Sequence, residues 1–283
     1  MPAAAVLVDG LIRAGGLIAL LALVGLWEAA APCRVLSARR SLRWPTNFTL
    51  GPLNALLAAV PLAPVALAIA LADHPPGLSM SVSLPRWLTV IAAVLLLDVV
   101  LYVQHRAFHA VRVLWAVHRV HHADVDCDYT TAFRFHPIEA MLTNATVLAV
   151  IAIVGLPPLA VLVHQSMAAI ITIIEHANAA WPAGLEALVR RIFVTPDMHR
   201  IHHSRERPST DSNFGTIFSF WDRWLGTYRQ PATTSRDGMD VGLEEFREPK
   251  YLTLPWTLAL PFLRSRVPGA LTTSSSAAPS RSV

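Results

Sequence analysis

The stretch Y-V-Q-H-R-A-F-H-A-V-R-V-L-W-A-V-H-R-V-H-H, residues 102–122, decides how the rest of the chain is interpreted. It reads as H-x-x-x-H followed by H-x-x-H-H, and a second H-x-x-H-H lies far downstream. The histidines of these motifs are His105, His109, His118, His121, His122, His199, His202 and His203. Residues three and four apart share one face of a helix, so each motif presents its imidazoles together. A lone histidine is usually a polar residue with a local partner, but three such motifs indicate ligands for two metal ions.

The composition predicts an integral membrane protein. Of the 283 residues, 54% are hydrophobic and 15% are charged, whereas soluble domains have about 45–50% and about 25%. The net charge of +4 is not arranged as a basic stripe with interleaved aromatic residues, so nucleic-acid binding is not expected. Two cysteines, Cys33 and Cys127, are too few for an iron–sulfur cluster, and there is no G-x-G-x-x-G motif for a dinucleotide.

Apolar segments predict four to five membrane helices. The expected spans are residues 15–32, 50–71 and 86–104, followed by a helical hairpin of 138–154 and 156–175. Residues 1–13 lack the basic region of a signal peptide, so the first helix is expected to be retained. The arginines at 34, 39, 40 and 43 mark the cytoplasmic side by the positive-inside rule. Counting crossings from there puts all three histidine motifs on that side.

The expected fold class is therefore an all-α integral membrane protein, in which a cytoplasmic, histidine-rich helical cap holds a dimetal site. Residues 1–95 are expected to form N-terminal transmembrane helices, and residues 96–247 a catalytic domain. Residues 248–263 are expected to be an interfacial apolar segment. Residues 264–283, rich in serine and alanine, are expected to be a disordered tail.

The order of the three motifs after several apolar helices resembles the fatty acid hydroxylase/sterol desaturase superfamily of integral-membrane non-haem diiron enzymes. Further matching blocks are T-A-F-R-F-H-P-I-E at 131–139, E-H-A-N at 175–178, T-P-D-M-H-R-I-H-H-S at 195–204 and W-D-R-W-L-G-T-Y at 221–228. The resemblance covers residues 96–228, whereas the first ninety residues match only in being apolar. It implies that the eight histidines of the motifs, with His176 as a ninth, bind two iron ions, which zinc can replace in purified protein. It also implies an oxidoreductase that uses O2 to hydroxylate or desaturate a lipid.

Several other polar residues are candidates for an additional ligand or for the partner of a ligand. Metal-bound histidines usually donate their second nitrogen to a carboxylate or a carbonyl. The candidates are His136, Asp98, Asp124, Asp128, Glu139, Asp197, Asn213 and Asp222. Asp98 lies within a predicted span and is expected to meet a ligand or an arginine from another helix. His164, deep in the hairpin, is expected to hydrogen-bond within the helix bundle, and His74 is expected to have no role.

Electrons are expected to come from a separate protein, because the chain has no flavin or nicotinamide fingerprint. Such a donor is a ferredoxin or a cytochrome b5-type carrier with its reductase. The arginines of residues 34–43, with Arg106, Arg112 and Arg119, are expected to attract an acidic carrier, or alternatively only to set topology.

The substrate and two rival functions stay open. The lipid can be a sterol, a fatty acyl chain or an ether lipid, and hydroxylation and desaturation share the same initial hydrogen abstraction. A non-catalytic metal-binding or metal-transport protein would place histidines along a path at mid-membrane depth. A bis-histidine haem protein would need isolated histidines on facing helices. The expected location is a bacterial inner membrane.

Overall fold

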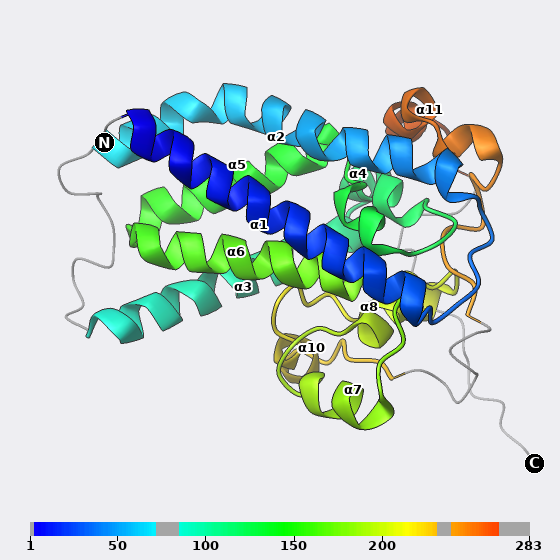
Figure 1. Cartoon of the computed structure of the whole chain (residues 1–283). Coiled ribbons are helices and arrows are strands. Elements are labelled where there is room, and N and C mark those ends of the chain that lie inside the picture. Colours follow the sequence, from blue (N-terminus) through cyan, green and yellow to red (C-terminus); the bar gives the residue numbers. More distant parts are fainter. Residues whose placement is uncertain (1–2, 72–84, 231–238, 266–283) are drawn as a thin grey trace, which may run out of the picture.

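The computed structural model describes residues 3–71, 85–230 and 239–265, and the regular elements of these residues are all helices, without a β-strand (Figure 1). Five long helices form the body of the protein. They are α1 (Ala3–Ala30), α2 (Arg40–Leu71), α3 (Arg86–Ala110), α5 (Pro137–Val154) and α6 (Pro158–Glu175). This confirms the predicted all-α class. The predicted tail beyond residue 265 and His74 lie outside the described residues.

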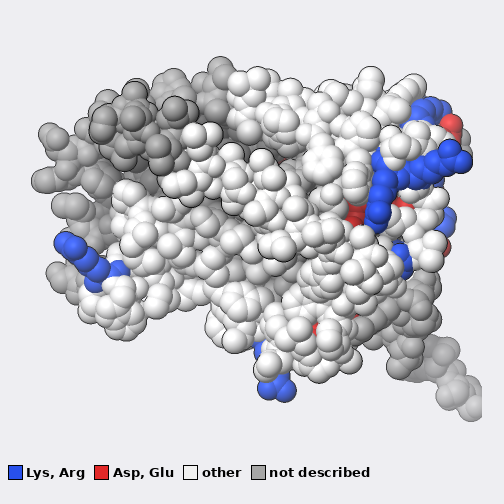
Figure 2. Space-filling model, viewed as in Figure 1, with Lys and Arg blue, Asp and Glu red and all other residues white. Residues whose placement is uncertain are grey.

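Among the described residues, four helices are long and apolar enough to cross a membrane: residues 10–30, 86–110, 137–154 and 158–175. Figure 2 shows that the charged side chains on one face of the molecule gather near the ends of these helices, whereas the surface between them is almost free of charge. This is the distribution expected of a bilayer-spanning body. The remaining predicted span, residues 50–71, lies within α2, whose side chains are described only up to residue 58.

The helical hairpin is confirmed, and its turn follows from three residues. Gly155 caps the C-terminus of α5 with a φ of 72°, a left-handed conformation that favours glycine. Pro157 is the N-cap of α6 and Pro158 its first residue, where a missing N–H costs nothing. Each arm has 18 residues, about 27 Å at 1.5 Å per residue.

Helix boundaries differ from the sequence-based expectations in two places. Helix α2 begins at Arg40, so Arg40 and Arg43 lie on its first turn and not in a loop. Helix α3 continues to Ala110 and therefore carries the H-x-x-x-H motif on its last turns. In both cases the apolar length predicted the membrane span, whereas the helix continues into polar residues whose backbone preferences allow it.

The cap is built from short helices at one end of the long ones (Figure 1). Its α-helices are α4 (Arg112–His122), α7 (Ala183–Val189), α8 (Pro196–His202), α9 (Arg207–Thr210), α10 (Phe220–Trp224) and α11 (Leu254–Ala259). The 3-10 helices are η2 (Tyr129–Phe133), η4 (Pro249–Leu252) and η5 (Leu260–Phe262). Helix α2 approaches η2 so closely that a Cβ on Gly51 would lie 2.9 Å from Phe133 Cδ1, so this contact requires glycine.

A buried ion pair joins α2 to the segment that follows α4. Arg43 donates to Asp124 (2.6 Å) and to Asp128 (2.8 Å), and all three side chains are almost fully buried. Burial alone would raise the pKa of the Asp124 carboxyl, but the Arg43 guanidinium holds that pKa well below its usual range. Asn47 adds a further donor to Asp124. Arg43 therefore stabilises the interior and is not part of a basic surface.

Candidate metal centre

A single break in the chain sets the first two histidine motifs against each other. Val111 has extended φ and ψ of −99° and 119°, ending α3 and serving as the N-cap of α4. His105 of α3 consequently lies 3.2 Å from His118 of α4, measured between their Nε2 atoms.

The nine predicted ligands fall into two groups. The first contains His105, His109, His118, His122 and His202, and the second contains His121, His176, His199 and His203. Within each group, one ligand nitrogen from every ring lies within 4.8 Å of the others. His121 and His122 are neighbours in the sequence but belong to different groups. The same is true of His202 and His203. Each H-x-x-H-H motif therefore contributes to both groups.

The inward-facing nitrogens have the spacing of atoms that share a cation. In the first group, His118 Nε2 lies 3.2 Å from the Nε2 atoms of both His105 and His122. In the second group, His176 Nε2 lies 3.1 Å from His121 Nε2 and 3.0 Å from His199 Nε2. A metal–nitrogen bond of about 2.0–2.1 Å with ligands at right angles places neighbouring nitrogens about 3 Å apart.

Hydrogen bonds on the outer side of the rings settle which nitrogen carries the proton. His105, His202 and His176 direct Nδ1 at the backbone carbonyls of Phe214 (2.9 Å), Ser212 (2.8 Å) and Thr172 (2.6 Å), respectively. A carbonyl only accepts, so Nδ1 is protonated and Nε2 of the neutral ring presents a lone pair.

The convergent lone pairs would suit a cation. Among the described side chains, the buried Nε2 atoms of His109 and His202 have no hydrogen-bond partner. His176 Nε2 carries no proton, yet it faces two other ring nitrogens within 3.1 Å. A buried lone pair without a donor is costly. The donor set therefore fits two metal ions of a type that accepts imidazole, such as iron or zinc.

Two carboxylates orient rings of the first group. Glu139 Oε1 lies 2.6 Å from His118 Nδ1, as expected from the sequence, and Asp211 Oδ1 lies 3.2 Å from His109 Nδ1. Asp211 was not expected, although it directly precedes Ser212 and the candidate residue Asn213 in the sequence. A carboxylate on Nδ1 raises the basicity of the opposite nitrogen, which strengthens a metal bond.

Burial keeps the cap histidines in the neutral form that binds metal. Desolvation, followed by repulsion from neighbouring imidazoles, lowers the pKa of five histidines well below the ordinary value of 6.5. These are His121, His122, His199, His202 and His203. Burial also lowers the pKa of His176 to about 4. The rings are thus unprotonated at neutral pH, as ligands must be.

The expectation for Asp98 was wrong. Its carboxylate accepts hydrogen bonds from the backbone N–H groups of Ile217 (3.1 Å) and Phe218 (3.2 Å) and from Trp221 Nε1 (2.8 Å). Asp98 therefore holds the segment before α10 against α3, and it meets neither an arginine nor a metal-binding histidine. The expectation for His164 was also wrong: this side chain is fully buried, and neither ring nitrogen has a hydrogen-bond partner among the described residues.

The remaining candidates lie outside both groups of histidines and stabilise the cap. Asp124 and Asp128 pair with Arg43, and Asp197 accepts from Arg200 at 2.8 Å. His136 is the N-cap of α5. Asn213 has a φ of 54° and joins the backbone of Met198 to that of Arg229. Most of these contacts join segments that are distant in the sequence, so the spacing of residues could not reveal them.

Asp222 acts on the site indirectly. Its carboxylate accepts from the backbone N–H groups of Phe214 (2.7 Å) and Gly215 (2.9 Å). These two bonds hold the peptide between Phe214 and Gly215 in place. The carbonyl oxygen of that peptide accepts the hydrogen bond from His105 Nδ1. Gly215 is needed here because an added Cβ would lie 2.8 Å from the Phe218 carbonyl oxygen.

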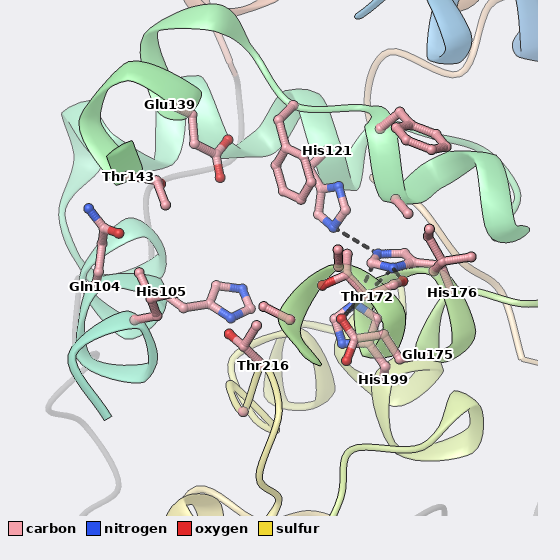
Figure 3. A pocket seen from close by; sticks show the side chains of 18 of the residues that line it. Gln104, His105, His121, Glu139, Thr143, Thr172, Glu175, His176, His199 and Thr216 are labelled. Atoms are coloured by element: carbon pink, nitrogen blue, oxygen red, sulfur yellow. Dashed lines mark hydrogen bonds and ion pairs between the residues drawn. The ribbon is translucent and has the colours of Figure 1, made fainter. Parts of the chain in front are cut away.

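A pocket of about 400 Å³ opens beside both groups of histidines (Figure 3). Its apolar walls come mainly from α3, α6 and the segment from η2 to Phe135, and five histidines of the two groups also line it: His105, His118, His121, His176 and His199. Polar side chains that also line it are Gln104, Glu139, Thr143, Gln165, Thr172, Glu175 and Thr216. Glu139 and Glu175 each have one buried carboxylate oxygen without a hydrogen-bond partner in the described structure. The pocket is thus mainly apolar, with hydrogen-bonding groups close to the histidines.

Comparison with known proteins identifies relatives over this region. Residues 90–227 match the family described as fatty acid hydroxylase. The chain is 31% identical over 131 residues to the alkylglycerol monooxygenase of Caenorhabditis elegans, covering 46% of this chain and 25% of that protein. It is 29% identical over 159 residues to an ornithine lipid hydroxylase of Rhizobium tropici, covering 56% and 46%. The chain therefore spans less than half the length of these relatives. No solved structure matches significantly.

Proposed function

We propose, from the membership of residues 90–227 in the fatty acid hydroxylase superfamily, that the chain is a membrane-bound oxygenase that hydroxylates a C–H bond of a lipid with two iron ions. The observation that carries this proposal is the set of nine imidazoles, eight of them buried, divided into two groups beside an apolar pocket. The catalytic domain is proposed to extend over residues 96–247.

The nine histidines are the proposed iron ligands, five for one ion and four for the other. Iron bound there would supply the reductive activation of dioxygen that an unactivated C–H bond requires. Glu139 and Asp211 orient His118 and His109 through their Nδ1 atoms. The carbonyl groups of Ser212, Phe214 and Thr172 orient further rings. The chain's own task is to hold these rings and to exclude water from the pocket.

The pocket supports an amphiphilic substrate. Apolar side chains such as Leu101, Phe108 and Ile173 suit a hydrocarbon chain, while Gln104 and Thr143 can hydrogen-bond a polar group close to the histidines. We therefore propose that the oxidised carbon lies near the polar end of the lipid. Hydroxylation is preferred to desaturation because the relatives are named as a monooxygenase and a hydroxylase.

A separate electron donor is part of the proposal. Hydroxylation of a C–H bond by O2 consumes two electrons and two protons and releases one water, and no described group of this chain stores electrons. A ferredoxin or a cytochrome b5-type protein suits this role. Arg43 and Arg119 are buried, so they do not belong to the predicted basic surface. Other arginines of that surface are exposed and can attract an acidic carrier: Arg39, Arg40, Arg106 and Arg112. The proposed location is a bacterial inner membrane with the cap in the cytoplasm.

Metal analysis with an assay on lipid extracts tests the function. Purified protein is expected to hold two iron ions per chain and, with O2 and a reduced carrier, to convert a lipid into a product one oxygen atom heavier. Incorporation of ¹⁸O from ¹⁸O2 identifies the oxygen source by mass spectrometry. One tightly bound ion per chain in active protein, or a haem absorption band, would contradict the proposal. A product two hydrogens lighter would instead identify a desaturase.

A further inference from the structure

A lateral lobe, defined here as residues 183–194 and 216–225, projects from the side of the long helices. It contains α7 and α10, which lie below α6 in the view of Figure 1. Its two segments are tied together by backbone bonds from Val194 N to the Ile217 carbonyl and from Ser219 N to the Ile192 carbonyl. Arg223 also donates to the Arg190 carbonyl at 2.6 Å. The two segments therefore form one unit.

The outer face of the lateral lobe is apolar. Leu188 is 62% exposed, Ile192 52% and Trp224 71%, and Leu185 and Leu225 are exposed beside them. Exposed large apolar side chains gathered on one small unit indicate a binding surface.

The lateral lobe exposes few charged side chains. Both of its carboxylates are buried: Glu186 accepts from Arg190 and Thr195, and Asp222 accepts from backbone groups. The exposed charged residue of the lobe is Arg191. A surface with exposed leucines and tryptophan, one exposed cation and no exposed carboxylate suits lipid headgroups better than water.

The anchoring of the lateral lobe places it at membrane depth. Asp98, which holds its base, lies eight residues before Arg106 on α3, about 12 Å deeper along the helix axis. Half of the hydrocarbon core is about 15 Å. The base of the lobe therefore meets α3 inside the leaflet on the cap side, if α3 crosses the bilayer.

The hydrogen bonds of Asp98 satisfy backbone groups that would otherwise be unpaired in the hydrocarbon region. Backbone N–H groups exposed to hydrocarbon are costly, and non-helical backbone is tolerated there only where protein satisfies it. Asp98 accepts the N–H groups of Ile217 and Phe218, and it also accepts Trp221 Nε1. This accounts for a carboxylate buried within a membrane helix without an arginine partner.

We propose that the lateral lobe is immersed in the cap-side leaflet of the bilayer that the long helices cross, with Leu188, Ile192, Trp224 and Leu225 among the lipids. Ile91, seven residues before Asp98 and so on the same side of α3, is also exposed. Thr216 belongs to the lobe and also lines the pocket beside the histidines. The lobe thus joins the pocket wall to the lipid phase from which the proposed substrate comes.

Spin-label accessibility in vesicles tests this inference. The cysteine variants are Leu188→Cys and Leu225→Cys on the lobe, Ile91→Cys on α3 and Glu206→Cys in the cap, all at exposed positions. The unsubstituted chain supplies the labelling background, because Cys33 and Cys127 are buried. Each labelled protein is reconstituted in phosphatidylcholine with phosphatidylglycerol, and its collisions with oxygen and with a water-soluble nickel chelate are measured.

The labels at 188 and 225 are expected to show a several-fold higher ratio of oxygen to nickel collisions than the label at 206, approaching that at 91. If the label at residue 188 showed the same oxygen-to-nickel collision ratio as the label at residue 206, while the label at residue 91 was in lipid, the inference would be overturned. The proposed membrane enzyme would remain intact. Protection of 188 from both reagents would mean that protein covers the lobe, and it would also overturn the inference. Water exposure of 91 would refute the membrane placement on which both proposals rest.

Discussion

Within each H-x-x-H-H motif, the first and last histidines belong to one of the two histidine groups and the middle one belongs to the other. His118 and His122 belong to the first group and His121 to the second. In the downstream motif the assignment is reversed, because His199 and His203 belong to the second group and His202 to the first. Residues four apart share a helix face, whereas adjacent residues point about 100° apart. Each motif therefore links the two metal groups.

Single histidine variants should report this division. His121→Ala leaves three ligands in the second group, and His202→Ala leaves four in the first. Metal content measured by mass spectrometry is expected to fall from two ions toward one per chain, more completely for His121→Ala, and turnover is expected to be lost. The protein should still partition into membranes, because apolar helices drive insertion. His136→Ala, outside both groups, is the control. Full metal content and normal activity of His121→Ala would refute the grouping.

The carboxylate on His118 makes a second prediction at this scale. Glu139→Gln keeps the shape of the side chain but removes the charge that accepts from His118 Nδ1 at 2.6 Å. Loss of such a partner typically lowers metal affinity or activity by about 10–100-fold. Competition with a chelator measures the affinity without relying on activity. Glu206→Gln, at an exposed cap position, should be unchanged. An unaltered affinity of Glu139→Gln would show that the contact is only structural.

At the level of elements, buried polar contacts connect the cap to the long helices. Arg43 connects α2 to Asp124 and Asp128, and Asp98 connects α3 to the lateral lobe. Breaking a buried pair by removing one partner leaves an uncompensated charge in a dry interior. Substitution of Arg43 should therefore be more damaging than substitution of an exposed arginine.

Arg43→Met is expected to destabilise the fold by about 3–5 kcal/mol. It should also change the pH dependence of stability. In the unsubstituted protein the pKa of Asp124 is depressed, so the pair contributes stability at neutral pH, and this contribution is lost only in strong acid. Without Arg43, burial raises that pKa, so the variant should lose stability as the pH rises. Thermal unfolding in detergent at pH 5 and pH 8 measures this, with Arg39→Met as the control. A smaller deficit at pH 8 than at pH 5 would contradict the argument.

For the whole molecule, the long helices have two different ends. One end carries the cap with both histidine groups, and the other carries the hairpin turn at Gly155 and the start of α3 at Arg86 (Figure 1). If α3 crosses the bilayer, the loop before α2 and the cap share one side. Arg86 then lies on the opposite side.

Cysteine labelling in sealed vesicles checks this topology. Arg39→Cys and Glu206→Cys, both at exposed positions, should react with an impermeant reagent from the same side, and Arg86→Cys from the other. Cys33 and Cys127 are buried and should contribute little background. Reaction of Arg39→Cys and Glu206→Cys from opposite sides would break the proposed arrangement.

The helical elements and the clustering of histidines could be predicted from the amino-acid sequence alone. Apolar runs and the Gly155–Pro158 punctuation predicted the helical hairpin, and histidines at helical spacing predicted the clusters. Both signals are local, because hydrophobic length and helix periodicity act over a few turns of one segment. The same reasoning placed Glu139 among the possible partners of the ligands, since a ligating imidazole needs an acceptor on its second nitrogen.

Only the tertiary structure decided which histidines share a group and what holds each ring. His176 meets His121 and His199 because α4, α6 and α8 converge, and the partners of His109 and His105 are Asp211 and the carbonyl group of Phe214. Likewise, Arg43 became an interior cation and Asp98 the anchor of a lobe. These pairings join residues 23 to 123 positions apart, and a periodicity of 3.6 residues carries no information about which distant segment closes over a given face.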